Sequence, residues 1–415
     1  MLRRSVARFT TVASAIGVSP TFWKDTEGVA GKHTDLQLVE CPRDAMQGLR
    51  DFVPTERKIE YIHALLKCGF HTVDCGSFVS APAVPQMADT AQVLKDLDMT
   101  NTNSKLLVVV CNLKGAVLAC KEEKVTYVGY PLSVSEIFQQ KNTRRDIKQA
   151  LLDIEQIHKI CEKNGKVLVT YISMAFGNPY KEDISIAQVQ ELVEKVASIG
   201  CRIISLADTV GTGTPEVIEE TFTTIIPKFP EIRIGGHFHS GATTAVDKVT
   251  AALKSGCRRL DSAIGGMGGC PFAKSALVGN VPTEGVLDCL DALGVPHPID
   301  MPQMKYCHSI KHDIFGVAVK ELVLAQTLNN ENWFRKLVNK HFDAHDKSGT
   351  GYLEKPEFAA SMREVFAELG EEEPPAEKIE RSFQKMDLTG DGVITIDEYM
   401  VGARRMLLKR LKEME

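Results

Sequence analysis

The clearest chemical signal in the sequence is a pair of histidines, His237 and His239, separated by one residue. Residues i and i+2 of a strand point to the same face, so a strand through this segment would bring the two imidazoles together. Two imidazoles and a carboxylate form a site for a divalent cation. Asp44, which follows another strand-like segment, can supply the carboxylate. A His-x-His pair alone is a weak signal, so its value depends on a fold that brings Asp44 beside it.

A second chemical signal is the segment 265–271, where four of the first five residues are glycine and Cys270 follows. So many glycines disfavour helix and strand, because glycine loses the most conformational freedom on folding. One interpretation is a loop that brings the Cys270 thiol over a bound substrate. The alternative is a loop with a buried, unreactive cysteine.

The C-terminal part contains two twelve-residue segments with regularly spaced oxygen-bearing side chains, 346–357 and 387–398. A Ca²⁺-binding EF-hand loop has ligands at positions 1, 3, 5, 7, 9 and 12 and glycine at position 6. The predicted ligands are Asp346, Ser348, Thr350, Tyr352, Glu354 and Glu357 in the first loop, and Asp387, Thr389, Asp391, Val393, Thr395 and Glu398 in the second. Apolar residues at helical spacing flank both loops, as expected for the helices of an EF-hand pair. The intact ligand sets favour a pair that binds Ca²⁺ over a degenerate pair that no longer binds.

The elements that must position the histidines form an alternating pattern of short β-branched runs and longer helical stretches. The predicted strands are 36–40, 72–75, 106–111, 126–130, 167–172, 202–206, 232–237 and 259–261. Eight such units predict an α/β fold, a (β/α)₈ TIM barrel, whose active site lies at the carboxyl ends of the strands. Polar residues do follow these ends, among them Asp74, Ser77 and Asp208. An open doubly wound sheet would need a glycine fingerprint after the first strand, and none is present there.

Composition and the chain ends define the remaining organisation. The 415 residues carry a net charge of −5, so we expect no nucleic-acid partner, and no apolar run is long enough to cross a bilayer. The first residues are basic and free of acids, which predicts a mitochondrial transit segment at 1–30, with a plastid address or a disordered tail as alternatives. We expect the barrel at 31–328, including a helix at about 306–326, and an all-α EF-hand pair at 329–415. The 11 cysteines contain no CxxC pair, which favours free thiols over a disulfide framework.

Several stretches, in order, resemble the 3-hydroxy-3-methylglutaryl-CoA lyase family. They are ECPRDAMQG, GSFVSAPAVPQMADTAQVL, LADTVGTGTPE, HFH, GGMGGCPFA and GNVPTE, and together they span about residues 36–295. The resemblance implies a carbon–carbon lyase that acts on an acyl-CoA, is located in mitochondria, and takes part in ketone-body formation and leucine degradation. Any self-association is expected as a homodimer.

The resemblance also implies roles for single residues. Arg43 would stabilise an enolate, and Cys270 would be needed for full activity. The ligands of Mg²⁺ or Mn²⁺ would be Asp44, His237, His239 and Asn280. Asp74 and Asp208 would be further carboxylates of the site, His237 a proton acceptor, and Gln47 and Ser77 contacts of the substrate. The reaction would be a retro-Claisen cleavage to acetyl-CoA and acetoacetate.

The sequence also departs from the family pattern. Ala45 follows Arg-Asp where glycine is usual, Ser240 follows the histidine pair where aspartate is common, and Val39 stands where glutamate often occurs. These differences leave the acyl-CoA open and indicate a divergent branch. Two alternatives remain: another Claisen-type synthase or aldolase on the same barrel, and a calcium sensor that uses the barrel as a scaffold.

Overall fold

The chain forms two compact units, one within residues 1–319 and one within residues 320–415. The computed structural model describes residues 36–49, 51–241, 244–268, 278–315, 331–368 and 373–414. The predicted transit segment at 1–30 and the predicted boundary between residues 328 and 329 both lie outside the described residues. No helix of the described residues is long and apolar enough to cross a membrane.

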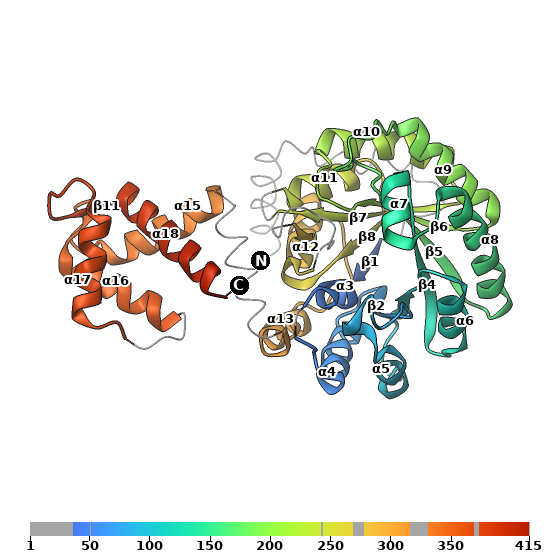
Figure 1. The fold of residues 1–415 in the computed structure, drawn as a ribbon, viewed down its shortest axis with the longest axis horizontal. Coiled ribbons are helices and arrows are strands. Elements are labelled where there is room, and N and C mark those ends of the chain that lie inside the picture. Colours follow the sequence, from blue (N-terminus) through green and yellow to red (C-terminus); the bar gives the residue numbers. More distant parts are fainter. Residues whose placement is uncertain are drawn as a thin grey trace, which may run out of the picture. The chain divides into compact units, whose positions relative to one another are not determined.

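The first unit is a closed barrel of eight parallel strands, as predicted (Figure 1). Each strand pairs with the next one along the chain, and β8 closes the ring by pairing with β1. The strands are β1 Gln37–Glu40, β2 Thr72–Ser77, β3 Lys105–Val109, β4 Val125–Ser133, β5 Val167–Ser173, β6 Ile203–Asp208, β7 Arg233–Ser240 and β8 Arg259–Ser262. A short strand, β9 Gly279–Asn280, adds to β7 in antiparallel orientation.

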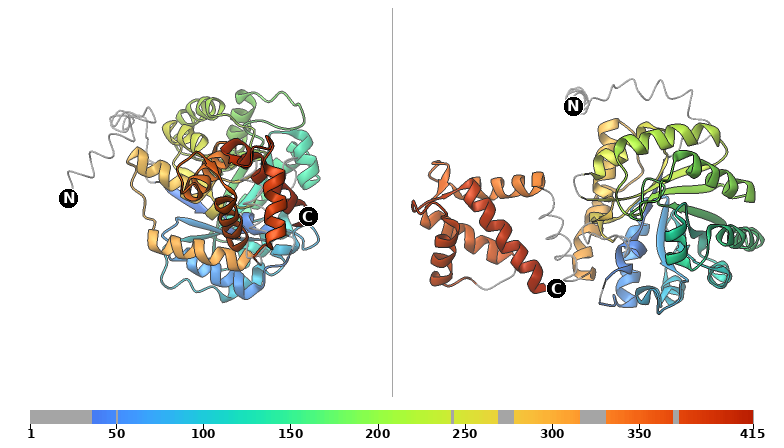
Figure 2. Two further views of the ribbon diagram at one scale, coloured as in Figure 1. Left: turned by 90° about the vertical axis from the view of Figure 1, so that its left-hand side faces the viewer. Right: turned by 45° about the horizontal axis from the view of Figure 1, so that its top comes forward.

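Helices surround these strands, mostly as an outer layer, and α3 and α7 also contribute residues to the barrel mouth (Figures 1 and 2). They are α3 Pro42–Gln47, α4 Thr55–Leu66, α5 Thr90–Asp96, α6 Leu113–Lys121, α7 Glu136–Thr143, α8 Ile147–Lys163, α9 Ile186–Ile199, α10 Pro215–Ile225, α11 Ala245–Lys254, α12 Thr283–Leu293 and α13 Met301–Phe315, with 3₁₀ turns at Pro85–Met87, Ile226–Lys228 and Ile264–Gly266. Helix α7 ends at Thr143, with Arg144 after it in a left-handed conformation, and α8 starts after a capping box formed by Asp146 and Gln149.

The last helix of the barrel unit, α13, begins at Met301, five residues before the predicted start. Gln303 donates a hydrogen bond to the carbonyl of Ala64 at the end of α4, and the thiols of Cys68 and Cys307 lie 3.5 Å apart. The helix therefore packs along α4 on the outside of the barrel. Residues 316–326 of the predicted helix lie outside the described residues.

The second unit contains two helix–loop–helix segments (Figure 2, orange to dark red). Its helices are α15 Glu331–His345, α16 Lys355–Glu368, α17 Ala376–Met386 and α18 Ile396–Met414. The loops are joined by antiparallel pairing of β10 Tyr352–Leu353 with β11 Ile394–Thr395, in which Leu353 pairs with Ile394. A separate apolar core that includes Phe342, Phe358 and Phe383 holds the helices together.

Candidate active site

The first part of the site is built by α3, the short helix that follows β1. Pro42 occupies its first turn, where a missing amide hydrogen has no cost and the fixed φ favours helix. Arg43, Asp44 and Gln47 then share hydrogen bonds: Arg43 Nη1 lies 2.7 Å from Asp44 Oδ1 and 3.0 Å from Gln47 Oε1. The helix thus presents a guanidinium, a carboxylate and an amide at the mouth of the barrel.

The guanidinium of Arg43 is held from β2 as well. Its Nε and Nη2 donate to the same oxygen of Asp74, at 3.0 and 2.6 Å. Burial raises the pKa of Asp74 to about 6, although Arg43 opposes this shift. Burial also acts against the charge on Asp44, but Arg43 and His239 hold the pKa of that carboxyl far below its usual range. Asp44 is therefore a permanent anion, and Asp74 can change its protonation near neutral pH.

Asp74 and Ser77 are both at the end of β2, but a regular strand would turn residues three positions apart to opposite faces. The pairing of β2 with β3 shifts register between Asp74 and Gly76, which inserts one extra residue. Ser77 consequently lines the same pocket as Arg43, and its buried Oγ has no hydrogen-bond partner among the described residues.

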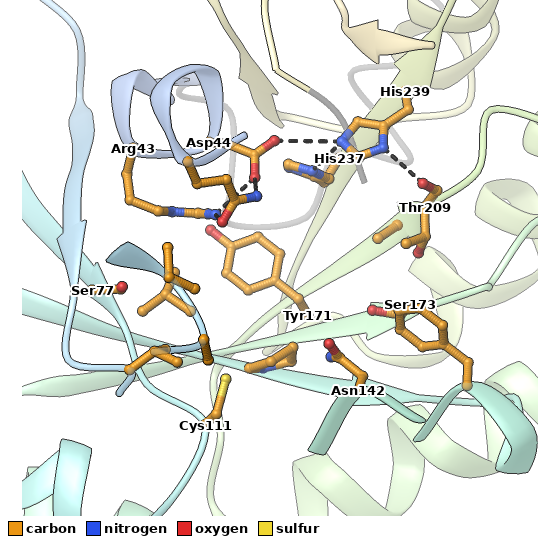
Figure 3. A pocket seen from close by; sticks show the side chains of 18 residues that line it. Arg43, Asp44, Ser77, Cys111, Asn142, Tyr171, Ser173, Thr209, His237 and His239 are labelled. Atoms are coloured by element: carbon orange, nitrogen blue, oxygen red, sulfur yellow. Dashed lines mark hydrogen bonds and ion pairs between the residues drawn. The ribbon is translucent and has the colours of Figure 1, made fainter. Parts of the chain in front are cut away.

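The two histidines of β7 point into the barrel mouth, as predicted (Figure 3). His237 Nδ1 lies 3.1 Å from Asp261 Oδ2, and His239 Nδ1 lies 2.7 Å from the carbonyl oxygen of Thr209. Both partners can only accept, so each imidazole carries its proton on Nδ1 when neutral. The Nε2 atoms are then free to act as ligands, and they lie 3.3 Å apart.

Asp44 completes a cluster of three metal-binding groups with His237 and His239. Its Oδ2 lies 3.5 Å from His239 Nε2. Neighbouring ligands of an octahedral Mg²⁺ ion with bonds of about 2.1 Å are about 3 Å apart, close to these separations. The carboxylate oxygen suits Mg²⁺ or Mn²⁺, and the two imidazole nitrogens also suit other first-row divalent cations. The residues therefore fit a divalent cation.

Asn280, the fourth predicted ligand, lies on β9 directly opposite His239 on β7. Its amide nitrogen donates to Asp44 Oδ2 at 2.7 Å and to the carbonyl of Met267 at 2.8 Å. The amide thus joins the cluster through Asp44. Whether its oxygen binds the cation stays a prediction.

The start of the glycine-rich segment is pressed against this cluster. A side chain on Gly268 would come within 2.4 Å of the carbonyl oxygen of Asp44 and 2.8 Å of the Asn280 amide nitrogen. Gly268 also has a φ of 87°, which residues with a side chain rarely adopt. Glycine is thus required where the segment passes the site. Cys270 lies outside the described residues, so its predicted role is untested.

Asp208 does not take the place expected from the sequence. Strand alternation turns Ala207 into the pocket and Asp208 toward the helices, where Lys248 of α11 lies 2.6 Å away. Both side chains are buried, and the amide of Gly213 also donates to Asp208. Asp208 therefore fixes α11 and the loop after β6, and the structure does not bring it among the carboxylates that face the pocket.

Two important residues were missed from the sequence. Asp261 orients His237, and it ends the predicted strand 259–261, so the strand-end rule that selected Asp74 and Asp208 could have found it. Tyr171 of β5 lines the pocket, and its ring packs edge-on against His237 with centroids 5.8 Å apart. A tyrosine in an alternating strand has no sequence signal that separates a core position from a pocket position.

The groups described above open into a pocket of about 310 Å³ at the carboxyl ends of the strands (Figure 3). Arg43, Asp44, Gln47, Ser77, His237 and His239 all line it, whereas Asp74 lies behind Arg43. Of the site residues predicted for the barrel that the structure describes, only Asp208 is separate from this constellation. The position is the one predicted for a TIM-barrel active site.

The two loops of the second unit are arranged like calcium sites. Gly351 and Gly392, at position 6, have φ values of 80° and 85° and make the turn that the loop needs. The position-12 glutamates bend back: Glu357 accepts from the amide of Ser348, and Glu398 from that of Thr389. Burial acts against the charge on Glu398, but hydrogen bonds from Thr395 and Thr389 lower its pKa to about 2.

Comparison with protein families gives two matches, one within each of the two compact units of the chain. Residues 36–310 match the HMGL-like family, and residues 334–403 match an EF-hand domain pair. The chain belongs to the HMGL-like family. It is 33% identical over 293 residues to the mitochondrial hydroxymethylglutaryl-CoA lyase of Bos taurus, with 70% of this chain and 88% of that protein covered. It is 34% identical over 269 residues to the cytoplasmic 3-hydroxy-3-methylglutaryl-CoA lyase of Danio rerio, with coverage of 64% and 79%.

Solved structures agree with this assignment to the HMGL-like family. The hydroxymethylglutaryl-CoA lyase of Pseudomonas aeruginosa has a TM-score of 0.64 and 30% identity, and the match covers 70% of this chain and 97% of that one. An HMG-CoA lyase of A. baumannii, solved with coenzyme A and 3-methylmalate, has a TM-score of 0.63 and 29% identity, with coverage of 68% and 92%. The chain is thus a homologue of carbon–carbon lyases and carries an EF-hand pair in addition.

Proposed function

We propose that this HMGL-like protein cleaves 3-hydroxy-3-methylglutaryl-CoA, or a related 3-hydroxyacyl-CoA, to acetyl-CoA and a ketoacid. The observation that carries the proposal is the convergence of Asp44, His237 and His239 beside Arg43 in one pocket. A Mg²⁺ or Mn²⁺ ion held by these three residues, with Asn280 beside them, would act as a Lewis acid on substrate oxygens. The names of the relatives support the acyl-CoA as substrate.

The reaction needs a group that takes the proton of the C3 hydroxyl. When that proton leaves, the C3–O bond becomes a carbonyl, the C2–C3 bond breaks, and its electron pair moves to the thioester as an enolate. His237 has one nitrogen facing the pocket, so it can bind a cation or accept a proton but not both. We assign His237 the role of cation ligand and Asp74 the role of proton acceptor. Asp74 lies behind Arg43, so a water molecule would carry the proton from the C3 hydroxyl of the substrate to Asp74.

Arg43 is the group that faces the developing negative charge. Of its five N–H donors, those on Nε and Nη1 and one on Nη2 are engaged by Asp74, Asp44 and Gln47, which fixes the plane of the guanidinium. The remaining Nη2 hydrogen has no partner among the described residues and is available to the enolate. A donor fixed before the reaction stabilises charge without reorganising. Cys270 is proposed to help deliver the final proton to C2.

A turnover assay tests the proposal directly. Full-length protein with Mg²⁺ and 3-hydroxy-3-methylglutaryl-CoA should release acetyl-CoA, and His237→Ala should lower the rate by several orders of magnitude. His71→Ala is a matched control, because His71 lies at the opposite end of the barrel strands. Consumption of acetyl-CoA with release of free coenzyme A when a ketoacid is added, without cleavage of the acyl-CoA, would favour a synthase. Cleavage of a hydroxy-ketoacid that carries no thioester would favour an aldolase. No turnover with any acyl-CoA, but Ca²⁺-dependent change of conformation, would favour a sensor.

We further propose that the EF-hand pair binds two Ca²⁺ ions through the twelve predicted ligands. The bent-back position of Glu357 and Glu398 supports this, because both carboxylates already face their loops. Calorimetry with the full chain and its Glu357→Gln/Glu398→Gln double variant tests it, and equal heats of Ca²⁺ binding in both would contradict the assignment. A mitochondrial location is proposed from the basic N-terminal segment and the name of the bovine relative, and imaging of the tagged chain with and without residues 1–30 tests it.

A further inference from the structure

The candidate pocket has two chemically different walls. Its charged side chains, Arg43 and Asp44, lie with the histidines on the side formed by α3 and β7. The lining also includes apolar side chains from four other places in the fold, and two of these places, β3 and β4, lie across the barrel from β7 and β8. The apolar residues are Val79, Ala83, Val84, Val109, Pro131 and Phe138. We call these six residues the apolar wall. In Figure 3 the charged groups and Cys111 lie on opposite sides of Tyr171.

Part of the apolar wall remains exposed, whereas Phe138 is buried. Leu106, Leu107 and Val108 of β3 are fully buried, but Val109 at the end of the same strand is partly exposed. Pro131 of β4 is partly exposed in the same way. Hydrocarbon surface on a barrel strand that still contacts solvent is stabilised when a ligand covers it.

The wall is also fixed in place before any ligand binds. Phe138 packs against Met174 and Val210 in a separate buried cluster. Val84 leads directly into the 3₁₀ turn Pro85–Met87, whose Gln86 is buried and accepts a hydrogen bond from the amide of Val53. A preformed apolar surface loses little entropy on binding, so the area that a ligand buries there is expressed in its affinity.

No charged side chain lies on the apolar wall among the described residues that line the pocket. The lining also contains the neutral polar residues Ser77, Asn142, Ser173 and Thr209. A carboxylate or phosphate would therefore find no counter-charge against this wall, whereas a hydrocarbon group would bury there. Ala83, on the loop after β2, is an exposed member of this wall with a small side chain.

We propose that the preferred substrate is a 3-hydroxyglutaryl thioester whose C3 substituent is a branched or longer alkyl group rather than methyl. This inference rests on the proposed function. C3 carries four groups: the hydroxyl and the carboxylate arm suit the charged side, and the thioester arm leads out toward coenzyme A. The fourth, the alkyl substituent, is left to face the apolar wall. Cleavage gives acetyl-CoA and a β-ketoacid that keeps this alkyl group.

The size of the preference follows from the hydrocarbon that is buried. Each buried methylene contributes a factor of about four to binding. An isobutyl group has three more carbons than methyl, and part of it stays exposed at the mouth. We therefore expect a ratio of kcat/KM values, isobutyl over methyl, of about tenfold or more.

The experiment compares 3-hydroxy-3-isobutylglutaryl-CoA with 3-hydroxy-3-methylglutaryl-CoA, using the full chain with Mg²⁺ and measuring acetyl-CoA release. Ala83→Leu fills the wall from an exposed loop position, so it should lower the isobutyl-to-methyl ratio several-fold. Ala91→Leu is the matched control, because Ala91 is exposed on α5 and does not line the pocket. Melting curves of both variants report whether they fold.

The outcomes separate the inference from the proposed function. A ratio of tenfold or more that falls in Ala83→Leu but not in Ala91→Leu supports the proposal. Equal or better cleavage of 3-hydroxy-3-methylglutaryl-CoA overturns the inference and leaves the proposed function standing. A preference that is unchanged in folded Ala83→Leu removes the apolar wall as its cause and also overturns it. If neither thioester releases acetyl-CoA, the proposed function fails and the inference fails with it.

Discussion

Asp261→Asn should weaken metal binding in the barrel without contact between residue 261 and the ion. Asp261 accepts a hydrogen bond from His237 Nδ1 at 3.1 Å and is almost completely buried. The carboxylate keeps the proton on Nδ1 and so leaves the Nε2 lone pair free for the cation. An asparagine can turn its NH₂ group toward Nδ1, which would move the proton to Nε2 and block the ligand atom.

The size of the effect follows from the geometry of this pair. Burial lowers the pKa of His237, but the hydrogen bond and the charge of Asp261 outweigh it and raise this pKa above its ordinary value. The same charge increases the basicity of Nε2 toward a cation. Loss of an outer partner of this kind costs about 10- to 100-fold in metal affinity, or roughly 1.4 to 2.7 kcal/mol. Asp261→Ala should fall at the upper end, because it removes the acceptor completely.

Titration of the metal-free protein with Mn²⁺, followed by the loss of the free-ion paramagnetic resonance signal, measures this affinity. Asp153→Asn is a matched control, since Asp153 is a buried aspartate on α8 that does not line the pocket. Its Mn²⁺ affinity should equal that of the unmodified protein. An unchanged affinity in both Asp261 variants would refute the reasoning that this hydrogen bond sets the state of His237.

Three further predictions address other parts of the chain. Arg43→Lys should lower kcat about 100-fold with little change in KM, because lysine cannot reproduce the fixed plane of the donors, and near-normal turnover would contradict the role of Arg43. Glu398→Gln should weaken Ca²⁺ binding roughly 10- to 100-fold in calorimetry, since the bidentate carboxylate is lost, and an unchanged second site would sink that assignment. Burial raises the pKa of Glu40 to about 8, so its protonated form is favoured in the folded state and stability is lost as pH rises from about 4.5 through 8. Glu40→Gln should remove this loss, which is at most about 5 kcal/mol. If the unfolding free energies of the variant and the unmodified protein change with pH by the same amount from pH 5 to 9, Glu40 is not the cause of the loss.

The sequence by itself determined the architecture of both units. The eight strands and the EF-hand loops are local patterns, because alternation, helical spacing and loop ligands are written in consecutive residues. The orientation of His237 and His239 was predictable for the same reason, since two residues of one strand share a face. The expected partnership with Asp44 also followed from a barrel in which the first and last strands meet.

Only the tertiary structure decided how the separate segments meet. A bulge in β2 lets Asp74 and Ser77 serve one site, and such a register shift has no reliable sequence signal. Asp208 satisfied every sequence criterion, yet the pairing of β6 with β7 turns it toward Lys248. The apolar wall is assembled from four separate elements between residues 79 and 138, so its shape depends on packing between elements. Residue type and spacing could therefore predict the kind of chemistry, whereas the register of the strands and the packing of helices on them selected the groups that face the substrate.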